Sequence, residues 1–168
     1  MTVRPIRPDD VPAAVGLVRE LADYEHALSE VRLTEEQLRT CLFGASPALF
    51  GHVAEDDEGH VVGLALWFLN FSTWRGTHGI YLEDLFVQPA HRGRGLGKEL
   101  LATLAAECVE RGYSRLEWSV LDWNTPSIDF YRAAGAVPMD EWTVFRLTDD
   151  ALTSFAAAQR WDRRPPRH

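Results

Sequence analysis

The segment from His91 to Leu101, HRGRGLGKELL, combines alternating glycines with basic side chains. Gly93, Gly95 and Gly97 leave the backbone unhindered, and the apolar pattern of a helix begins at Leu96. Glycine permits positive φ and a close approach of the backbone to a ligand. The first N–H groups of a helix are unpaired and carry partial positive charge. This turn therefore predicts a binding site for an anion, and a pyrophosphate fits it best.

Two other nucleotide-binding motifs fit this segment less well. A Walker loop requires Ser or Thr after Gly97 and Lys98, but Glu99 follows. A dinucleotide fingerprint requires the spacing G-x-G-x-x-G directly after a strand, whereas residues 88–91 intervene here. From the residues alone, a flexible glycine-rich connector with solvated arginines remains the alternative.

The elements that must position this turn alternate along the chain. We expect strands at 2–7, 49–54, 61–71, 80–87, 114–121 and 142–147. We expect helices from Asp9 or Asp10 to near Glu25, from Thr34 to about Leu42, from Leu96 to Arg111, from Thr125 to before Gly135, and around 150–160. This order predicts an α/β fold, a single domain with a mixed, largely antiparallel central sheet flanked by helices. The domain is expected to span residues 1–150, and residues 151–168 to form a C-terminal helix and a basic, frayed tail.

Several boundaries follow from local signals. Thr34 and Gln37 have the spacing of a capping box, and Gly112 is expected to stop the long helix. Pro5 favours an edge position for the first strand, and residues 55–59 have the composition of a hairpin turn. Trp142 begins the last expected strand.

Composition narrows the class of protein. The formal net charge is −8, which argues against nucleic-acid binding and suits a cationic small molecule. No apolar run is long enough to span a membrane, and the N-terminus lacks a signal peptide, so we expect a cytoplasmic protein. Cys41 and Cys108 are expected to be buried hydrophobes, and the histidines show no metal-ligand spacing.

A resemblance to a family extends this interpretation. The block YLEDLFVQPAHRGRGLGKELL resembles the acyl-CoA-binding motif of the GNAT superfamily of N-acetyltransferases, whose signature (R/Q)-x-x-G-x-(G/A) is filled by Arg92, Gly95 and Gly97. NTPSIDFYRAAGA, residues 124–136, resembles the second motif of that superfamily. ELADYE, LTEEQL, YLEDLFV and WNTPSIDFY resemble its spermidine/spermine (diamine) N-acetyltransferase branch. The resemblance covers residues 3 to 150 and implies acetyl-CoA as co-substrate, no metal, and a homodimer.

The activity implied is acetyl transfer from acetyl-CoA directly to a primary amine of a small, cationic, polyamine- or diamine-like substrate. Arg75 and His78 are basic residues that would reduce the negative charge of a substrate channel. Related sequences in this branch acetylate other amines, and the alternatives that the resemblance implies are thialysine, another amino-acid-like amine, an antibiotic or a protein lysine as acceptor. An alternative of another class is a non-catalytic acyl-CoA-binding module.

The resemblance also assigns residues to the coenzyme. Backbone groups of the strand end would hold the pantetheine arm, those near Phe86 and Val87 would polarise the thioester carbonyl, and the glycine turn would hold the phosphates. Asn124 and Ser127 would contact the arm from the other side. The full set is Leu85, Phe86, Val87, Arg92, Gly93, Arg94, Gly95, Leu96, Gly97, Lys98, Asn124 and Ser127.

The catalytic roles implied are a base and an acid. An alkyl amine has a pKa near 10.4, so a carboxylate that accepts its proton would help. Glu83 and Asp84 are the candidates for this base. Because side chains alternate along a strand, these two neighbours are expected to point to opposite faces of the sheet. The resemblance favours Glu83. Tyr131 matches the proton donor to the thiolate, although the helical spacing of Ile128, Tyr131 and Ala134 also suits a core side chain.

Further residues are implied as substrate contacts. Besides Glu83, these are Tyr24, Glu25, Glu117, Trp118 and Ser119. Trp74 and Trp123 could flank the entrance, because aromatic faces accept ammonium groups. For Glu25, a solvated helix end is the competing interpretation.

Overall fold

The computed structural model describes residues 1–158 and divides the chain into two compact units. The first unit is Met1–Ile128, and the second begins at Asp129. Within residues 1–158, no helix has both the length and the apolar character needed to cross a membrane. The expected division into residues 1–150 and 151–168 stays a prediction.

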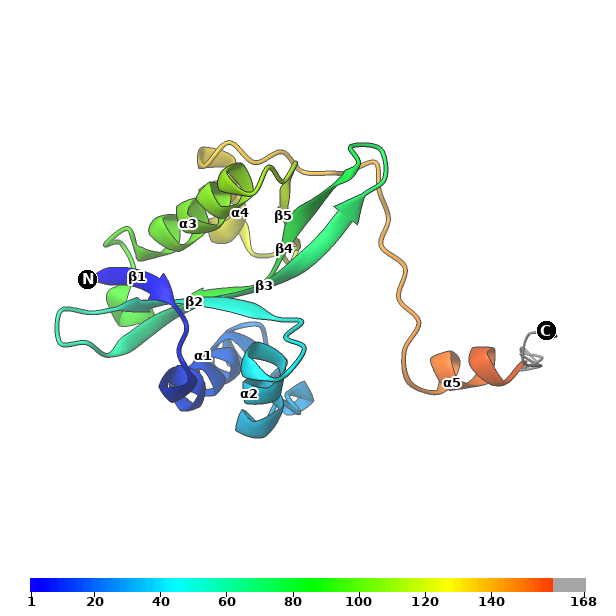
Figure 1. Ribbon diagram of the computed structural model, residues 1–168, viewed down its shortest axis with the longest axis horizontal. Coiled ribbons are helices and arrows are strands. Elements are labelled where there is room, and N and C mark those ends of the chain that lie inside the picture. Colours follow the sequence, from blue (N-terminus) through cyan, green and yellow to red (C-terminus); the bar gives the residue numbers. More distant parts are fainter. Residues whose placement is uncertain (159–168) are drawn as a thin grey trace. The chain divides into compact units, whose positions relative to one another are not determined.

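A five-stranded sheet organises the first unit (Figure 1). Its strands lie side by side in chain order: β1 (Thr2–Pro5), β2 (Phe50–Glu55), β3 (Val61–Ser72), β4 (Thr77–Val87) and β5 (Leu116–Trp118). Neighbours from β1 to β4 are antiparallel, and β5 runs parallel to β4. The mixed, largely antiparallel sheet and the edge position of Pro5 are thus confirmed. The strand expected at 114–121 is shorter, because β5 pairs only with Ile80–Leu82 of β4.

The helices of the first unit begin and end close to the predicted residues. They are α1 (Val11–Tyr24), α2 (Glu35–Phe43) and α3 (Leu96–Glu110), with short 3-10 turns η1 (Pro8–Asp10), η2 (Leu28–Glu30) and η3 (Pro89–His91). The capping box forms: the Gln37 amide donates to Thr34 Oγ1 at 3.2 Å, and the Thr34 amide donates to Gln37 Oε1 at 3.0 Å. Gly112, at φ 67°, follows the end of α3 as expected.

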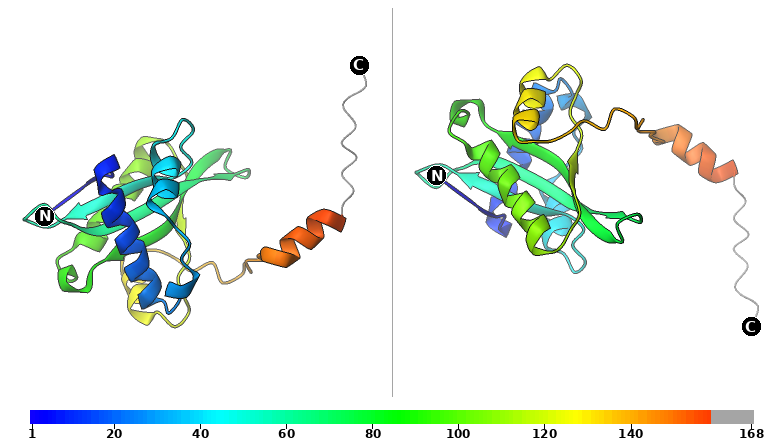
Figure 2. Two further views of the ribbon diagram at one scale, coloured as in Figure 1. Left: turned by 90° about the horizontal axis from the view of Figure 1, so that it is seen from below. Right: turned by 90° about the horizontal axis from the view of Figure 1, so that it is seen from above.

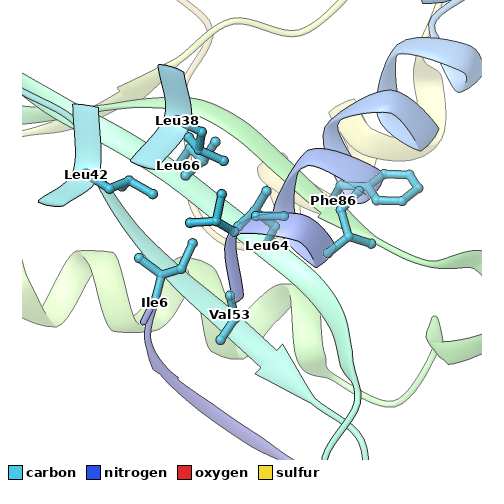
Figure 3. Close-up of a cluster of buried hydrophobic side chains, with 10 residues drawn as sticks. Ile6, Leu38, Leu42, Val53, Leu64, Leu66 and Phe86 are labelled. Atoms are coloured by element: carbon cyan, nitrogen blue, oxygen red, sulfur yellow. The ribbon is translucent and has the colours of Figure 1, made fainter. Parts of the chain in front are cut away.

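The helices cover both faces of the sheet. Helices α1 and α2 lie on one face and α3 on the other (Figures 1 and 2). Between the sheet and the first two helices lies an apolar cluster (Figure 3) that contains Ile6, Val11, Ala14, Leu17, Leu38, Leu42, Val53, Leu64, Leu66 and Phe86. Each large side chain buried in this way stabilises the fold by about 1.5–3 kcal/mol. Through Phe86, this cluster packs the C-terminal half of β4 against α1.

An ion cluster fixes the start of the chain to the sheet. The Arg4 guanidinium bonds both Asp10 carboxylate oxygens, at 2.7 and 2.9 Å, and also bonds Glu55. Asp10 accepts a further hydrogen bond from the Arg7 amide at 2.7 Å. These bonds hold the pKa of Asp10 below its usual value, the Arg4 hydrogen bond being the largest cause. Asp10 therefore ties α1 to β1, and no side chain caps the first turn of α1.

Two expectations for side chains and strands are wrong. Cys41 is exposed, because α2 buries only the stripe that carries Leu38 and Leu42, while Cys108 is buried as expected. Residues 142–147 form no strand, since no other segment within residues 1–158 pairs with them.

The helices near the end of the chain are α4 (Thr125–Ala133) and α5 (Asp149–Ala158). Both were predicted, and Gly135 follows α4 at φ 91°. The basic tail and the last residues of the helix expected around 150–160 lie outside the described residues.

Candidate functional site

The glycine turn has the backbone geometry that an anion site requires. Gly93 and Gly95 have φ values of 76° and 86°, in the left-handed region that favours glycine. Gly95 is the N-cap of α3, and among residues 1–158 no side-chain cap hydrogen bond forms at this helix start. A Cβ added at Gly93 or Gly95 would meet no heavy atom within 4 Å, so the approach to this backbone is open. The turn therefore fits a phosphate ligand.

Strand β4 contains a bulge at Glu83. Leu66 pairs with Asp84 and Trp67 pairs with Leu82, so Glu83 is an extra residue on β4. Paired residues share a face of the sheet. Asp84 thus shares the α1 and α2 face with Leu66, whereas Leu82 lies with Trp67 on the α3 face. Strict alternation fails between Leu82 and Asp84, because the extra residue interrupts the pleat, and the opposite faces expected for Glu83 and Asp84 stay a prediction.

The bulge also determines which backbone N–H groups of β4 are left unpaired by β3 and can bind a ligand. The Gln88 amide donates to the Val62 carbonyl at 2.9 Å, and alternation from this pair directs the N–H groups of Phe86 and Asp84 toward β3. The N–H groups of Leu85 and Val87 therefore face the opposite edge. Pairing with β5 ends at Leu82, so no strand among residues 1–158 covers that edge from Glu83 onward. Leu85 and Val87 thus suit the predicted coenzyme contact, and the Phe86 amide does not.

Arg92 contacts the protein itself. Its Nε donates to the Val87 carbonyl at 2.8 Å. Its guanidinium carbon lies 5.3 Å from the centroid of the Tyr24 ring and 5.4 Å from that of Phe86. These contacts join the end of β4 to the end of α1 and give Arg92 a positioning role in addition to the predicted contact with phosphate.

Tyr24 and Asn124 form a second link across the site, although 100 residues separate them in the sequence. The Tyr24 hydroxyl donates to Asn124 Oδ1 at 3.1 Å, and the same oxygen accepts from the Ser127 amide at 3.3 Å. Asn124 is buried, and the Tyr24 ring lies 5.9 Å from the Trp123 ring. Asn124 thus caps α4 and anchors its first turn to α1. Tyr24, predicted as a substrate contact, has its hydroxyl engaged in this bond.

Three carboxylates gather where α1 ends beside β4. Glu25 follows the last residue of α1, and burial raises its pKa. Burial, together with the negative charges of Glu83 and Glu25, raises the pKa of Asp84 from 3.8 to about 6. Glu83 is exposed and Asp84 is half-buried. This arrangement provides a local negative field and a carboxyl group able to exchange a proton near neutral pH.

Glu117 of β5 and Ser119, which follows the strand, are both engaged by neighbouring side chains. Glu117 Oε2 accepts from Asn70 Nδ2 at 2.7 Å and lies 2.9 Å from Arg115 Nε. Ser119 Oγ lies 2.7 Å from the Tyr81 hydroxyl, within hydrogen-bond distance. Trp118 pairs with Leu82 at the last position that joins β5 to β4. Because Arg115 offsets its charge, Glu117 contributes less negative potential than its residue type suggests.

Tyr131 lies on α4 in the second unit, where its ring centroid is 5.3 Å from that of Phe130. Its predicted position beside the thioester stays a prediction. Trp74 lies in the turn between β3 and β4 and is 88% exposed.

Two of these contacts were not predicted from the sequence, that of Arg92 with aromatic rings and that of Arg115 with Glu117. The stacking of Arg92 on Tyr24 depends on residues far apart in the chain, and no spacing rule could have found it. Arg115 and Glu117 are only two positions apart, a spacing that places side chains on one face of a strand. Among residues 1–158, no group of three or more His, Cys, Asp or Glu side chains is placed to hold a metal ion.

Comparison with known proteins identifies the architecture. The model of the acetyltransferase (GNAT) family matches residues 17–136, which include the glycine turn, the bulged strand and Tyr131. The chain belongs to the GNAT acetyltransferase family. The protein is therefore an N-acetyltransferase of a family that uses acetyl-CoA.

Named relatives of this GNAT chain act on amines. A thialysine N-epsilon-acetyltransferase from Bos taurus is 37% identical over 92% of this chain and 96% of its own length. An L-ornithine N5-acetyltransferase from Arabidopsis thaliana is 42% identical over 55% of this chain and 40% of its own length. A spermidine/spermine N(1)-acetyltransferase-like protein from Homo sapiens is 29% identical over 92% of this chain but only 23% of its own length.

Solved structures share the fold. An integron cassette protein from the mobile metagenome of V. cholerae has a TM-score of 0.76 at 24% identity and covers 92% of this chain and 96% of its own.

Proposed function

We propose that this GNAT enzyme acetylates the side-chain amine of an amino-acid-like substrate such as thialysine or ornithine. Relatives named thialysine N-epsilon-acetyltransferase align with nearly the whole chain, and the ornithine enzyme is similar over the shared part. The polyamine substrate expected from the sequence has weaker support, because the spermidine/spermine-like relative is less similar.

The chain supplies a binding surface for both parts of the co-substrate. Free N–H groups at the start of α3 bind the diphosphate, and the N–H groups of Leu85 and Val87 bind the arm along the open edge of β4. The bound co-substrate contributes an acetyl group activated as a thioester. Gly93 and Gly95 keep the approach to the diphosphate site open, and Arg94 and Lys98, both exposed, add positive charge beside it.

The remaining residues act on the amine and on the leaving sulfur. Glu25, Glu83 and Asp84 attract the cationic amine, and a carboxylate at the bulge accepts its proton. Tyr131 donates a proton to the sulfur as the C–S bond breaks. The observation that carries this function is the juxtaposition of a bare β4 edge, a proton-accepting carboxylate and an open anion turn in one unit.

We further propose that the enzyme acts as a homodimer in the cytoplasm. The supporting observation is an unusual number of exposed apolar side chains after residue 136, which include Val144 at 83% and Phe145 at 93% exposure. Apolar groups in such a run favour association with another chain. The net charge of −8 disfavours nucleic acid as a partner.

A thiol-release assay with acetyl-CoA tests this function. The acceptors are thialysine, ornithine, lysine, putrescine, spermidine, spermine and an aminoglycoside. We expect the highest kcat/KM for thialysine or ornithine. A preference for spermidine or spermine would return the substrate to the polyamine class, and calorimetry that shows no binding of acetyl-CoA would refute the enzymatic function.

A further inference from the structure

Asp84 occupies a distinctive position on β4. The bulge at Glu83 transfers it to the α1 and α2 face, where it pairs with Leu66 at the margin of the apolar cluster. The next residue, Leu85, directs its N–H group to the open edge of β4. Asp84 is therefore a half-buried carboxylate one residue from the backbone donor that would contact the co-substrate.

The charged groups around Asp84 differ in their effect on its pKa. Glu83 on β4 and Glu25 at the end of α1 both act on it as negative charges. Arg92, a cation at the end of β4, lies against the Tyr24 and Phe86 rings and donates to the Val87 carbonyl. Arg92 does not contribute to the shift in the pKa of Asp84, whose causes are burial, Glu83 and Glu25.

We propose that Asp84, rather than Glu83, accepts the proton from the substrate ammonium group. This inference rests on the proposed function and deepens it. Glu83 is exposed, and it attracts the cation without accepting the proton. Glu25 acts through Asp84 as a positioning residue, because its charge keeps the neighbouring carboxylate basic.

The proton transfer fits into a balanced reaction. A proton leaves the substrate nitrogen and forms an O–H bond on the Asp84 carboxylate, which frees the nitrogen lone pair. The lone pair forms the C–N bond to the thioester carbonyl carbon, and the C–S bond breaks. The sulfur takes a proton from Tyr131, which regains one from solvent. The second proton lost by nitrogen and the proton held by Asp84 pass to solvent, so one proton is released for each acetyl group transferred.

The raised pKa explains why Asp84 suits this step. With a pKa of about 6, the carboxyl group is about nine-tenths ionised at pH 7 and is ready to accept a proton. The rise of about two pKa units from 3.8 makes the transfer from an amine roughly 100-fold more favourable than for an ordinary aspartate. An acceptor with a pKa closer to the operating pH is the more efficient base.

The experiment compares kcat/KM against pH for the wild-type enzyme, D84N, E83Q and E25Q, with thialysine or the best acceptor of the panel. A matched control is E110Q, because Glu110 is exposed at the end of α3. The acidic limb of kcat/KM reports the base of the free enzyme. We expect a wild-type limb near pH 6 and the same limb in E110Q.

The variants separate the three carboxylates. D84N should lose the limb and at least 100-fold in kcat, whereas E83Q should keep the limb and raise KM. E25Q should move the limb to lower pH, because removing a like charge lowers the pKa of Asp84. Thermal melting and calorimetry with acetyl-CoA on each variant show whether the fold and the co-substrate site survive.

The possible failures are distinguishable. If the wild-type enzyme turns over but E83Q abolishes the limb and D84N keeps it, Asp84 is not the proton acceptor while the proposed function stands. A limb that does not move in E25Q would overturn the role of Glu25. If the wild-type enzyme releases no thiol with any acceptor, the proposed function fails and the role of Asp84 fails with it.

Discussion

Substituting Gly95 by alanine tests the anion turn most directly. Gly95 has φ 86° at the N-cap of α3, where a Cβ is strained whatever the surrounding space. The left-handed conformation costs a non-glycine residue about 1–2 kcal/mol. For a chain of this size, that cost should lower Tm by about 2–8 °C. If the backbone instead relaxes, the N–H groups at the start of α3 turn away from a shared ligand.

Gly97 provides a matched control from the same turn. It lies inside α3, and a Cβ there would be 3.9 Å from Val87 Cγ2, an ordinary contact. Alanine at this position favours the helix by up to about 1 kcal/mol. Gly97→Ala should therefore keep or raise Tm.

Calorimetry with acetyl-CoA, together with thermal melting, separates the two variants. We expect Gly95→Ala to weaken binding at least tenfold and Gly97→Ala to change it by less than about threefold, the tenfold loss being equivalent to about 1.4 kcal/mol. Equal binding by Gly95→Ala and the wild-type protein would refute the role of this conformation. A Gly97→Ala variant that loses binding as severely would show that space, and not backbone conformation, limits the site.

Three further predictions concern other parts of the site. Tyr131→Phe should lower kcat by at least about 100-fold in the thiol-release assay, with unchanged calorimetric affinity for acetyl-CoA, and a normal kcat would remove its role as acid. Asn124→Ala should lower the free energy of unfolding by about 2–3 kcal/mol in urea titrations, because a helix cap and the bond from Tyr24 are both lost; an unchanged urea midpoint would contradict this. Asp84→Asn should stabilise the protein by up to about 3 kcal/mol at pH 7.5. Because the pKa of Asp84 is raised from 3.8 to about 6 in the folded protein, its ionisation destabilises the fold, and stability falls as pH rises through that window. In thermal melts of the wild-type protein and Asp84→Asn, the difference in stability should vanish below pH 4. A difference that persists there would show that the ionisation of Asp84 is not its cause.

Local signals in the sequence predicted much of the fold. The capping box at Thr34 and Gln37 and the glycine at position 112 act within a few residues of the boundaries that they set. The strand that was wrongly predicted depends on pairing with a distant part of the chain. Residues 142–147 have the composition of a strand, but a strand also needs a partner, and residues 1–158 provide none.

The candidate site was predicted in its composition and only in part in its geometry. The glycine turn has a clear signature because positive φ favours glycine. The bulge at Glu83 has none, since neither glycine nor proline marks it. Without the bulge, neither the face occupied by Asp84 nor the available N–H groups of Leu85 and Val87 could be deduced.

The extra residue in β4 has a consequence for how this enzyme tolerates change. Removing Glu83 would bring Leu82 directly before Asp84, opposite Trp67 and Leu66, and would restore a regular pleat without turning the residues that follow. Asp84 and Phe86 would keep their pairing with Leu66 and Leu64, and Phe86 would keep its apolar neighbours. A substitution at Glu83 alters one side chain, whereas its deletion would remove the bend and the extra twist that the bulge gives to this part of β4.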